Sequence, residues 1–502
     1  MLQIFRQPVF LISVAVIAAL VTAGSVYPEV FEQAAGTALD RTTEYFGWFY
    51  LLSVFGFVAV LVYLACSGYG NIRLGRADSR PEYSFFSWVA MLLAAGFGVG
   101  LVFYGMAEPM SHYLNPPHGQ MEGLTPEAAR LAIQYSFFNW GVHQWAAFAI
   151  VGLIIAFFQF RKGEPGLVST VLRPATAKLA KGRDQIGGAF DIFAVVATVM
   201  GVATSIGLGV MQINGGLHFL FADISEGIVW QAVILVALAA AYIVSTITGL
   251  HRGIRVLSTF NLALALGLML FVLIAGPTRV ILESIVQGIG DYLQNFFVMG
   301  MQTAVFEGST WAREWTVFYW AWVIAWSPFV GAFIARISKG RTIREYIFGV
   351  LVMPPLLACL WIGIFGTTAL YMDMTAGAGL AAATDENMTT ALFKLFAVLP
   401  LPQILSVLGL ILIFIFLVTS ADSATYIIAQ MTDRGSINPP LAKRLIWGGL
   451  LAAICLTLIA TGGLRGLQAG AVLSALPFTF LIYAMIWILF RELAADKKIK
   501  PE

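Results

Sequence analysis

Three tryptophans stand close together in one apolar segment, and their chemistry suits the recognition of a cation. Residues 316–329 read TVFYWAWVIAWSPF, in which Ser327 and Pro328 interrupt the apolar run. Trp322 and Trp326 are spaced i, i+4, so a helix places both indoles on one face. The face of an indole attracts a cation by about 0.5–2 kcal/mol. We predict a cation-binding surface here; the alternative is an aromatic belt at a membrane surface.

A second aromatic group lies in another apolar segment. Trp140, Trp145 and Phe148 could form the opposite wall of a cage. His143, in the same segment, could titrate near neutral pH. A single histidine is more often a hydrogen-bonded packing residue, and we expect packing here.

Three glycines at alternate positions, Gly96, Gly98 and Gly100, lie in a third apolar segment. Each weakens a helix by about 1 kcal/mol relative to alanine. The segment is either unwound, with free N–H groups for a substrate carboxylate and free carbonyls for a cation, or it is a surface for close helix packing. The sequence alone leaves both interpretations open.

Hydroxyl groups near the end of a fourth apolar segment could bind a metal ion. Thr419 and Ser420 offer hard oxygen ligands that suit sodium, although such groups often bond to their own helix. Asp422 is costly inside a membrane and is therefore a functional candidate, but we favour a paired, structural carboxylate. Thr198 and its neighbouring hydroxyls form either a second ion site or backbone hydrogen bonds, and we favour the latter.

The composition predicts a membrane protein. Hydrophobic residues make up 59% of the 502 residues and charged residues 11%, whereas a soluble domain carries about 25% charged residues. Apolar runs near the spanning length of ~20 residues predict twelve helices, at 9–26, 47–66, 85–107, 135–159, 190–219, 228–249, 256–276, 315–335, 346–371, 403–429, 445–461 and 469–490.

The charge distribution predicts the orientation. With both termini in the cytoplasm, most of the 29 Lys and Arg residues fall in inner segments, as the positive-inside rule requires. We expect the first run to be retained as a span and the protein to lie in a bacterial inner membrane. No nucleic-acid-binding stripe, paired carboxylates, nucleotide loop or His/Cys cluster is visible, so we predict neither an enzyme nor a catalytic residue.

The helix-breaking residues in two predicted spans point to a transporter. The third and eighth predicted spans both contain helix-breaking residues, and paired broken helices indicate an inverted-repeat transporter with a site at mid-membrane. Residues 278–300 have helical apolar spacing and predict an amphipathic helix on the outer surface.

Five motifs resemble the betaine/choline/carnitine transporter family over nearly the whole chain. They are GLVFYGMAEP (100–109), WGVH (140–143), the segment from Trp320 to Gly331, ARISKGRTIRE (335–345) and TSADS (419–423). The resemblance implies an all-α fold of the leucine-transporter type, a homotrimer with the amphipathic helix near its contacts, and substrates that are zwitterions or quaternary ammonium cations. The implied division is two N-terminal helices (1–84), a first inverted repeat (85–276), an outer helix and loop (277–314), a second repeat (315–490) and a short tail (491–502).

The resemblance also implies ion sites. One sodium would bind the carbonyls of Ala94, Phe97 and Phe416 and the hydroxyls of Thr419 and Ser420. A second would use Thr198 and Phe329, but Val202 stands where the family has another threonine. Sodium is thus the expected coupling ion, and no other cofactor is expected.

The cage departs from the family. Val323 replaces one of two adjacent tryptophans, and Phe148 replaces a tyrosine. We therefore expect a substrate bulkier than glycine betaine or less dependent on a trimethylammonium head, such as carnitine, ectoine, proline or a sulfonium compound. Choline is not favoured, because Gly100 stands where proton-coupled relatives place an aspartate.

The sequence thus predicts a sodium-coupled importer of a zwitterionic compatible solute that works by alternating access. A cage formed by Trp140, Trp145, Phe148, Trp322, Trp326 and Val323 would hold the substrate. The backbone groups of Gly96, Gly98 and Gly100 would bind its acidic end. The alternatives are a sodium-independent antiporter of the carnitine type, a proton symporter using Asp422 or His143, and a channel or sensor. The short tail makes tail-mediated osmotic activation unexpected.

Overall fold

The computed structural model describes residues 7–96, 98–119, 121–176, 183–248 and 251–498. Over these ranges the chain is helical, without a β-strand; one isolated bridge joins Arg73 and Thr342. The helices of the first half are α1 (Pro8–Val26), α2 (Pro28–Cys66), α3 (Phe85–Gly96), α4 (Val99–Leu114), α5 (Pro126–Trp140), α6 (Val142–Ala156), α7 (Val168–Thr176), α8 (Arg183–Leu220), α9 (Ile228–Thr248) and α10 (His251–Ala275).

The second half continues the all-α architecture. Its helices are α11 (Thr278–Gln294), α12 (Phe296–Met301), α13 (Trp311–Glu314), α14 (Thr316–Ile337), α15 (Ile343–Ala376), α16 (Leu380–Glu386), α17 (Ala391–Ala397), α18 (Pro402–Met431) and α19 (Leu441–Lys498). Short 3-10 or π segments are η2 (Gly68–Asn71), η3 (Pro117–Gly119), η4 (Phe157–Arg161) and η5 (Met388–Thr390).

The predicted membrane segments all fall in helices. Ten described helices are long and apolar enough to cross a membrane, and the bent pair α3–α4 makes an eleventh. The long helix α19 contains the last two predicted segments, and its backbone leaves the helical conformation between them at Gly463 (φ 53°, ψ −128°). A side chain at Gly470 would contact Leu458, so the chain reverses there. The prediction of an all-α polytopic membrane protein is confirmed.

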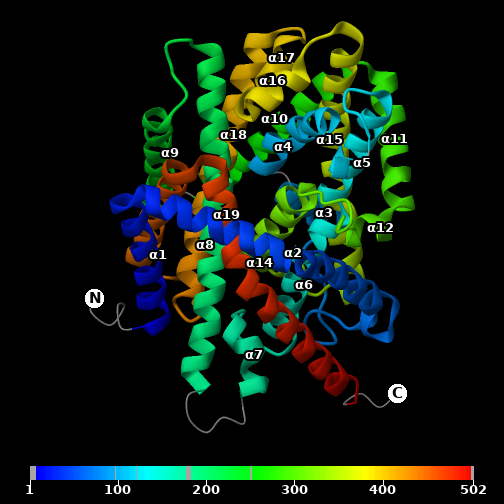
Figure 1. Cartoon of the computed structure of the whole chain (residues 1–502). Coiled ribbons are helices and arrows are strands. Elements are labelled where there is room, and N and C mark those ends of the chain that lie inside the picture. Colours follow the sequence, from blue (N-terminus) through cyan, green and yellow to red (C-terminus); the bar gives the residue numbers. More distant parts are fainter. Residues whose placement is uncertain (1–6, 97, 120, 177–182, 249–250, 499–502) are drawn as a thin grey trace.

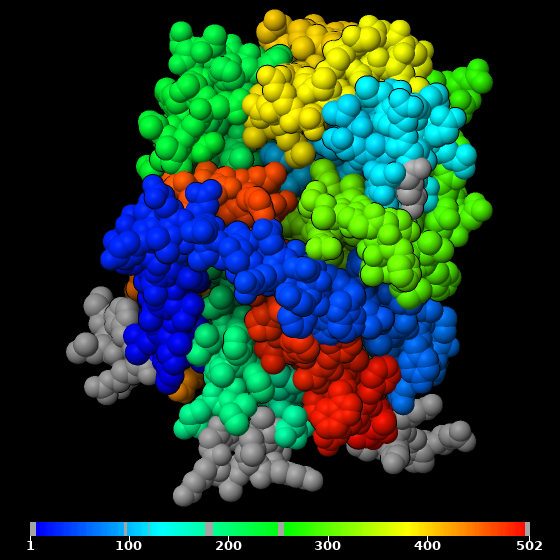
Figure 2. Space-filling view, viewed as in Figure 1, coloured from blue at the N-terminus to red at the C-terminus, as the bar shows by residue number. Residues whose placement is uncertain are grey.

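Burial separates central from peripheral helices. The apolar windows of Pro126–Arg161, Asp184–Leu220 and Trp311–Ile337 are 94%, 83% and 78% buried, whereas those of α1, α9 and α10 are each 22% buried. The centre is therefore formed by α5–α6, α8 and α14, with α8 running the height of the molecule (Figure 1). Helices α1 and α2 lie across one face and cover part of α19 (Figure 2).

The third predicted span is broken, as its glycines indicate. Helix α3 ends at Gly96, Gly98 has an extended backbone (φ −146°, ψ 169°), and α4 begins at Val99. The two helical pieces are inclined by 65°. Gly100 lies in the first turn of α4 and is not part of the unwound segment.

The prediction that the eighth span is interrupted is wrong. Helix α14 runs without a break through Ser327 and Pro328. Proline cannot donate a hydrogen bond to the carbonyl four residues earlier, which is that of Ile324. The hydroxyl of Ser327 donates to this carbonyl at 2.7 Å, so the ladder bond lost at Pro328 is replaced locally and the helix continues.

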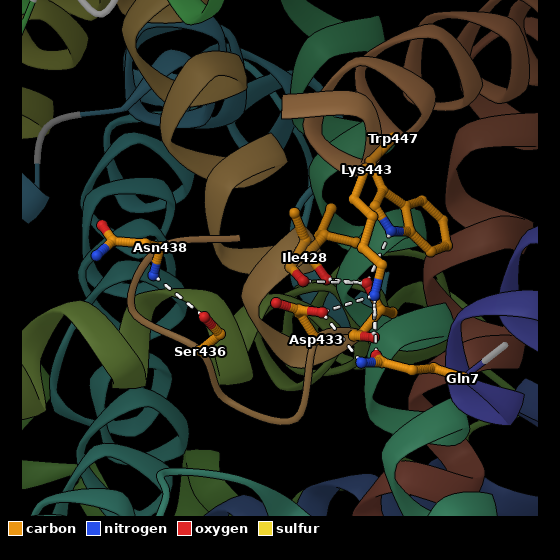
Figure 3. Close-up of polar contacts among 9 residues, drawn as sticks. Gln7, Ile428, Asp433, Ser436, Asn438, Lys443 and Trp447 are labelled. Atoms are coloured by element: carbon orange, nitrogen blue, oxygen red, sulfur yellow. Dashed lines mark hydrogen bonds and ion pairs between the residues drawn. The ribbon is translucent and has the colours of Figure 1, made fainter. Parts of the chain in front are cut away.

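Polar contacts tie the N-terminal helix to the second half at one end of the molecule (Figure 3). The ammonium group of Lys443, which is fully buried, donates to Asp433 and to Gln7 at 2.8 Å each. Gln7 precedes α1 and also donates to Asp433, at 3.1 Å. Trp447 donates to the Thr432 hydroxyl at 3.0 Å. Because the ammonium group of Lys443 is hydrogen-bonded to Gln7 before α1 and to Asp433 after α18, this buried lysine holds α1 against the connection between α18 and α19.

An ion pair joins the loop before α3 to the C-terminal end of α14. Arg336 contacts Glu82 at 3.1 Å. Its hydrogen bond and positive charge lower the pKa of the Glu82 carboxyl below its usual value.

The predicted amphipathic helix is α11. Its buried positions, Ile281, Ile285, Gly288 and Tyr292, follow helical spacing, while Val286 is 74% exposed. Helix α11 packs on α5 and α15. Two polar contacts fasten it: Arg130 donates to both Asp291 oxygens at 2.6 and 2.7 Å, and Tyr292 hydrogen-bonds His143 at 2.9 Å.

We expect Ser327→Ala to lower the stability of the protein by about 1 kcal/mol, because it leaves the buried Ile324 carbonyl without a donor. The measurement is thermal unfolding of the purified protein in detergent. Ser327→Thr, which keeps the hydroxyl, is the control. Equal stability of the wild type and the alanine variant would contradict this account of the continuous helix.

Candidate substrate-binding site

Five predicted aromatic rings form one continuous series of contacts at the centre of the molecule. Trp140 of α5 meets Trp322 of α14 edge to face (centroids 6.2 Å apart, 87° between planes). Trp322 stacks on Trp326 at 6.4 Å and 13°. Trp326 contacts Phe148 of α6 at 5.9 Å, and Phe148 contacts Trp145 at 5.3 Å. We call these five rings the aromatic cage.

Two tyrosines that the sequence analysis did not assign to the site join the cage. Tyr104 of α4 lies 6.3 Å from Trp140 and 6.5 Å from Trp322, and Tyr319 lies 5.4 Å from Trp140. Tyr319 precedes Trp322 by three residues, a spacing that places both on one helical face. That spacing could have identified Tyr319 from the sequence. The position of Tyr104 within the motif GLVFYGMAEP could have identified Tyr104.

The glycines lie directly against the tryptophans. A side chain at Gly100 would overlap the six-membered ring of Trp322, and one at Gly98 would lie 3.8 Å from the ring of Trp326. Both structural features considered for the glycine segment are present: Gly100 allows close packing, and the helix break precedes Val99. The first N–H groups of α4 have no partner four residues earlier, and their dipole favours an anionic group. Gly96 supplies the last residue of α3.

Helix α8 fixes the orientation of Trp322. The indole N–H lies 3.2 Å from both the Gly201 carbonyl and the Ser205 hydroxyl. A side chain at Gly201 would lie 2.9 Å from the Trp326 backbone nitrogen, so α8 and α14 approach closely there. Val323, adjacent to this contact in sequence, is 3% exposed. The contact between α8 and α14 therefore fixes the orientation of the Trp322 ring.

The predicted ion ligand Thr419 bonds within its own helix. Its hydroxyl donates to the Ile415 carbonyl at 2.9 Å and to the Phe416 carbonyl at 3.2 Å, which is the structural alternative named for these hydroxyls, and Ser420 is half-buried. Ala94 is exposed near the end of α3. Phe97 lies outside the described residues. Oxygen donors of this kind fit a sodium ion.

The hydroxyls of α8 bond to backbone carbonyls. Thr198 is buried and donates to Ala194 at 2.7 Å, and Thr204 donates to Met200 and to Leu467 of α19. Phe329, the other predicted member of a second ion site, stacks on Trp326 at 5.9 Å. These contacts favour the structural interpretation of the hydroxyls.

Three other titratable residues have structural contacts. Asp422 accepts a 2.6 Å bond from Thr246 of α9, and His143 packs 4.1 Å from Phe296 beside α11. Asp191 lies inside α8, which begins at Arg183. It accepts from the Ser169 N–H at 2.9 Å and so caps α7.

A polytopic helical bundle with a broken helix facing an aromatic cage defines a membrane transporter of small molecules. The model of the betaine/carnitine/choline family transporters (BCCT) matches residues 8–498. The chain belongs to this family and is a transporter, not an enzyme.

Named relatives cover nearly the entire chain. An ectoine/hydroxyectoine transporter of Virgibacillus pantothenticus is 49% identical over 98% of this chain and 97% of its own length. The glycine betaine transporter OpuD of Bacillus subtilis is 45% identical over 98% of this chain and 95% of its own length. A probable glycine betaine transporter of Desulfitobacterium hafniense is 39% identical over 98% of each chain.

We expect Gly100→Ala to reduce substrate affinity more than tenfold, because the new methyl group displaces the Trp322 ring. Gly98→Ala is the matched control, since its methyl group reaches only ordinary contact distance from Trp326. Its affinity should change less than about threefold. Binding is measured by isothermal titration calorimetry on purified protein. Equal effects of the two substitutions would contradict the assigned glycine–indole contact.

Proposed function

We propose that the protein is a secondary active transporter that imports a zwitterionic compatible solute of the betaine or ectoine type. The aromatic cage binds the positively charged end of the solute, and the first N–H groups of α4 bind its carboxylate. The observation that carries this proposal is the proximity of the two parts: a side-chain carbon at Gly98, at the helix break, would be 3.8 Å from the Trp326 ring of the cage. A zwitterion needs both features within one small space.

The cage favours a broad, delocalised cation. Val323 stands where the resemblance predicts another indole, which leaves more volume and one fewer π face. An ectoine-type ring spreads its positive charge over two nitrogens and is larger than a trimethylammonium head. The 49% identity to an ectoine/hydroxyectoine transporter supports the same choice. Carnitine, proline and sulfonium compounds stay in the substrate screen.

Sodium is the proposed coupling ion, and the transport cycle is alternating access. Phe416, Thr419 and Ser420 supply oxygen ligands on α18, which packs near α4. Residues 262–275 contain no basic side chain that could replace the ion, as the resemblance implies for sodium-independent exchangers. One sodium crossing 100 mV contributes about 2.3 kcal/mol, which corresponds to roughly fifty-fold accumulation.

The proposed location is a bacterial inner membrane, with both termini in the cytoplasm and the protein assembled as a homotrimer through surfaces near α11. The start of α1 and the end of α19 both lie toward the lower end of the molecule (Figure 1), which supports one common side for the termini.

A thermal-shift screen of the purified protein tests the substrate and the ion together. Ectoine, glycine betaine, carnitine, proline and dimethylsulfoniopropionate are compared with and without sodium. Ectoine or glycine betaine should raise the melting temperature, and more so with sodium. Counterflow in sodium-free proteoliposomes would instead support an antiporter, and uptake driven by a pH jump alone would support a proton symporter.

Trp326→Leu should abolish concentrative uptake into proteoliposomes while the protein still inserts and purifies. The substitution removes the ring that connects the two walls of the cage, whereas Trp326 is only partly buried, so folding should survive. Phe480→Leu, at a 51% exposed position of α19, is the control. Uptake by Trp326→Leu at the wild-type rate would refute the cage as the substrate site.

A further inference from the structure

A carboxylate lies behind the aromatic cage. Glu108 of α4 is fully buried, with 0% exposure. It was not assigned a role from the sequence because the predicted span ended one residue before it. An ionised side chain inside a membrane protein costs several kcal/mol unless its oxygens are bonded. The hydrogen-bond partners of Glu108 therefore determine its role.

Four side chains in the described residues contact Glu108. One oxygen lies 2.8 Å from the Asn139 amide nitrogen and 3.2 Å from Nε2 of His112. The other accepts the indole N–H of Trp140 at 2.7 Å and the hydroxyl of Tyr319 at 2.6 Å. These partners come from α4, α5 and α14, so the carboxylate joins three central helices.

The chemistry of the partners suits an ionised carboxylate. Indole and amide N–H groups can only donate, and one of them faces each carboxylate oxygen. The 2.6 and 2.7 Å distances lie within the range of hydrogen bonds to an ionised acceptor. An ionised Glu108 cannot donate, so it requires a proton on Nε2 of His112. No lysine or arginine is among the four partners.

Two of the four donors are rings of the site. Glu108 holds Trp140 and Tyr319 by their polar edges, which leaves their faces for other contacts. A hydrogen bond to an anion polarises the N–H or O–H group and increases the electron density of the attached ring. A richer π face attracts a cation more strongly. The geometry therefore places a carboxyl group one hydrogen bond behind the cage.

We propose that Glu108 is a positioning residue that orients Trp140 and Tyr319 and, through them, supplies the negative charge by which the cage prefers a cationic substrate head to a neutral one of the same shape. This inference rests on the proposed function. It assigns the charge selectivity to a residue that need not touch the substrate.

The test compares pairs of ligands that differ in charge but not in shape. Glycine betaine is paired with 3,3-dimethylbutanoate, in which carbon replaces the charged nitrogen, and ectoine is paired with 3-methylcyclohex-2-ene-1-carboxylate, in which carbon replaces both ring nitrogens. Dissociation constants are measured on the purified full chain by competition. The selectivity is the dissociation constant of the ligand with the neutral head divided by that of the ligand with the cationic head. Glu108→Gln keeps the shape of the side chain and removes its charge, and we expect it to lower this ratio about tenfold.

Matched variants separate charge from folding. Glu108→Asp keeps the charge and should retain most of the selectivity. Glu226→Gln alters a carboxylate bonded by Asn387 and Thr389 outside the cage and should leave the ratio unchanged. Tyr319→Phe removes one donor but keeps the ring, and should lower the ratio several-fold. A double variant of Glu108→Gln and Tyr319→Phe should show less than the sum of both effects.

The outcomes distinguish this inference from the proposed function. If the wild type binds neither glycine betaine nor ectoine, the proposed function fails. If it binds one of them and Glu108→Gln weakens both members of the pair equally, Glu108 has only a structural role and the inference is overturned. Should Glu108→Gln not fold, an unchanged ratio in Tyr319→Phe overturns it as well.

Discussion

The absence of water in the membrane interior is the constraint on which this structure depends. A helix that stops inside the bilayer exposes N–H and carbonyl groups, and these are tolerated only inside protein or beside a polar cavity. The break between α3 and α4 is such a place, and it lies against the tryptophans of α14. The backbone polarity that would be costly in lipid becomes the means of binding an anionic group.

The two interruptions seen in the sequence have opposite outcomes. At the glycines the helix ends, because glycine weakens the helical conformation and Gly98 adopts an extended backbone. At Pro328 the neighbouring Ser327 bonds the carbonyl that proline cannot reach, and α14 stays continuous. A continuous α14 keeps Trp322 and Trp326 one turn apart and stacked. The broken helix and the straight helix therefore contribute different things: one offers free backbone groups, the other a rigid series of rings.

Several polar groups buried around the cage are bonded to one another across helices. Trp322 donates to α8, and Trp140 and Tyr319 donate to Glu108. Such bonds between helices compensate the desolvation of each group and also fix ring orientations. The same contacts that make the interior stable thus set the shape and the charge that a substrate meets.

The sequence by itself determined the membrane class, the apolar helices and two groups of aromatic rings, because these follow from apolar run length and from residue spacing within each segment. It left the glycine segment either unwound or closely packed. It also carried the family motifs. Only the tertiary structure decided that Tyr104, Tyr319 and Glu108 adjoin the cage, that Gly100 packs under Trp322, and that α14 is unbroken. The contacts of Tyr104, Tyr319, Glu108 and Gly100 depend on side chains from different helices meeting in space, and a periodicity within one helix does not specify its partners. The continuity of α14 depends on the rotamer of Ser327, which bonds the Ile324 carbonyl.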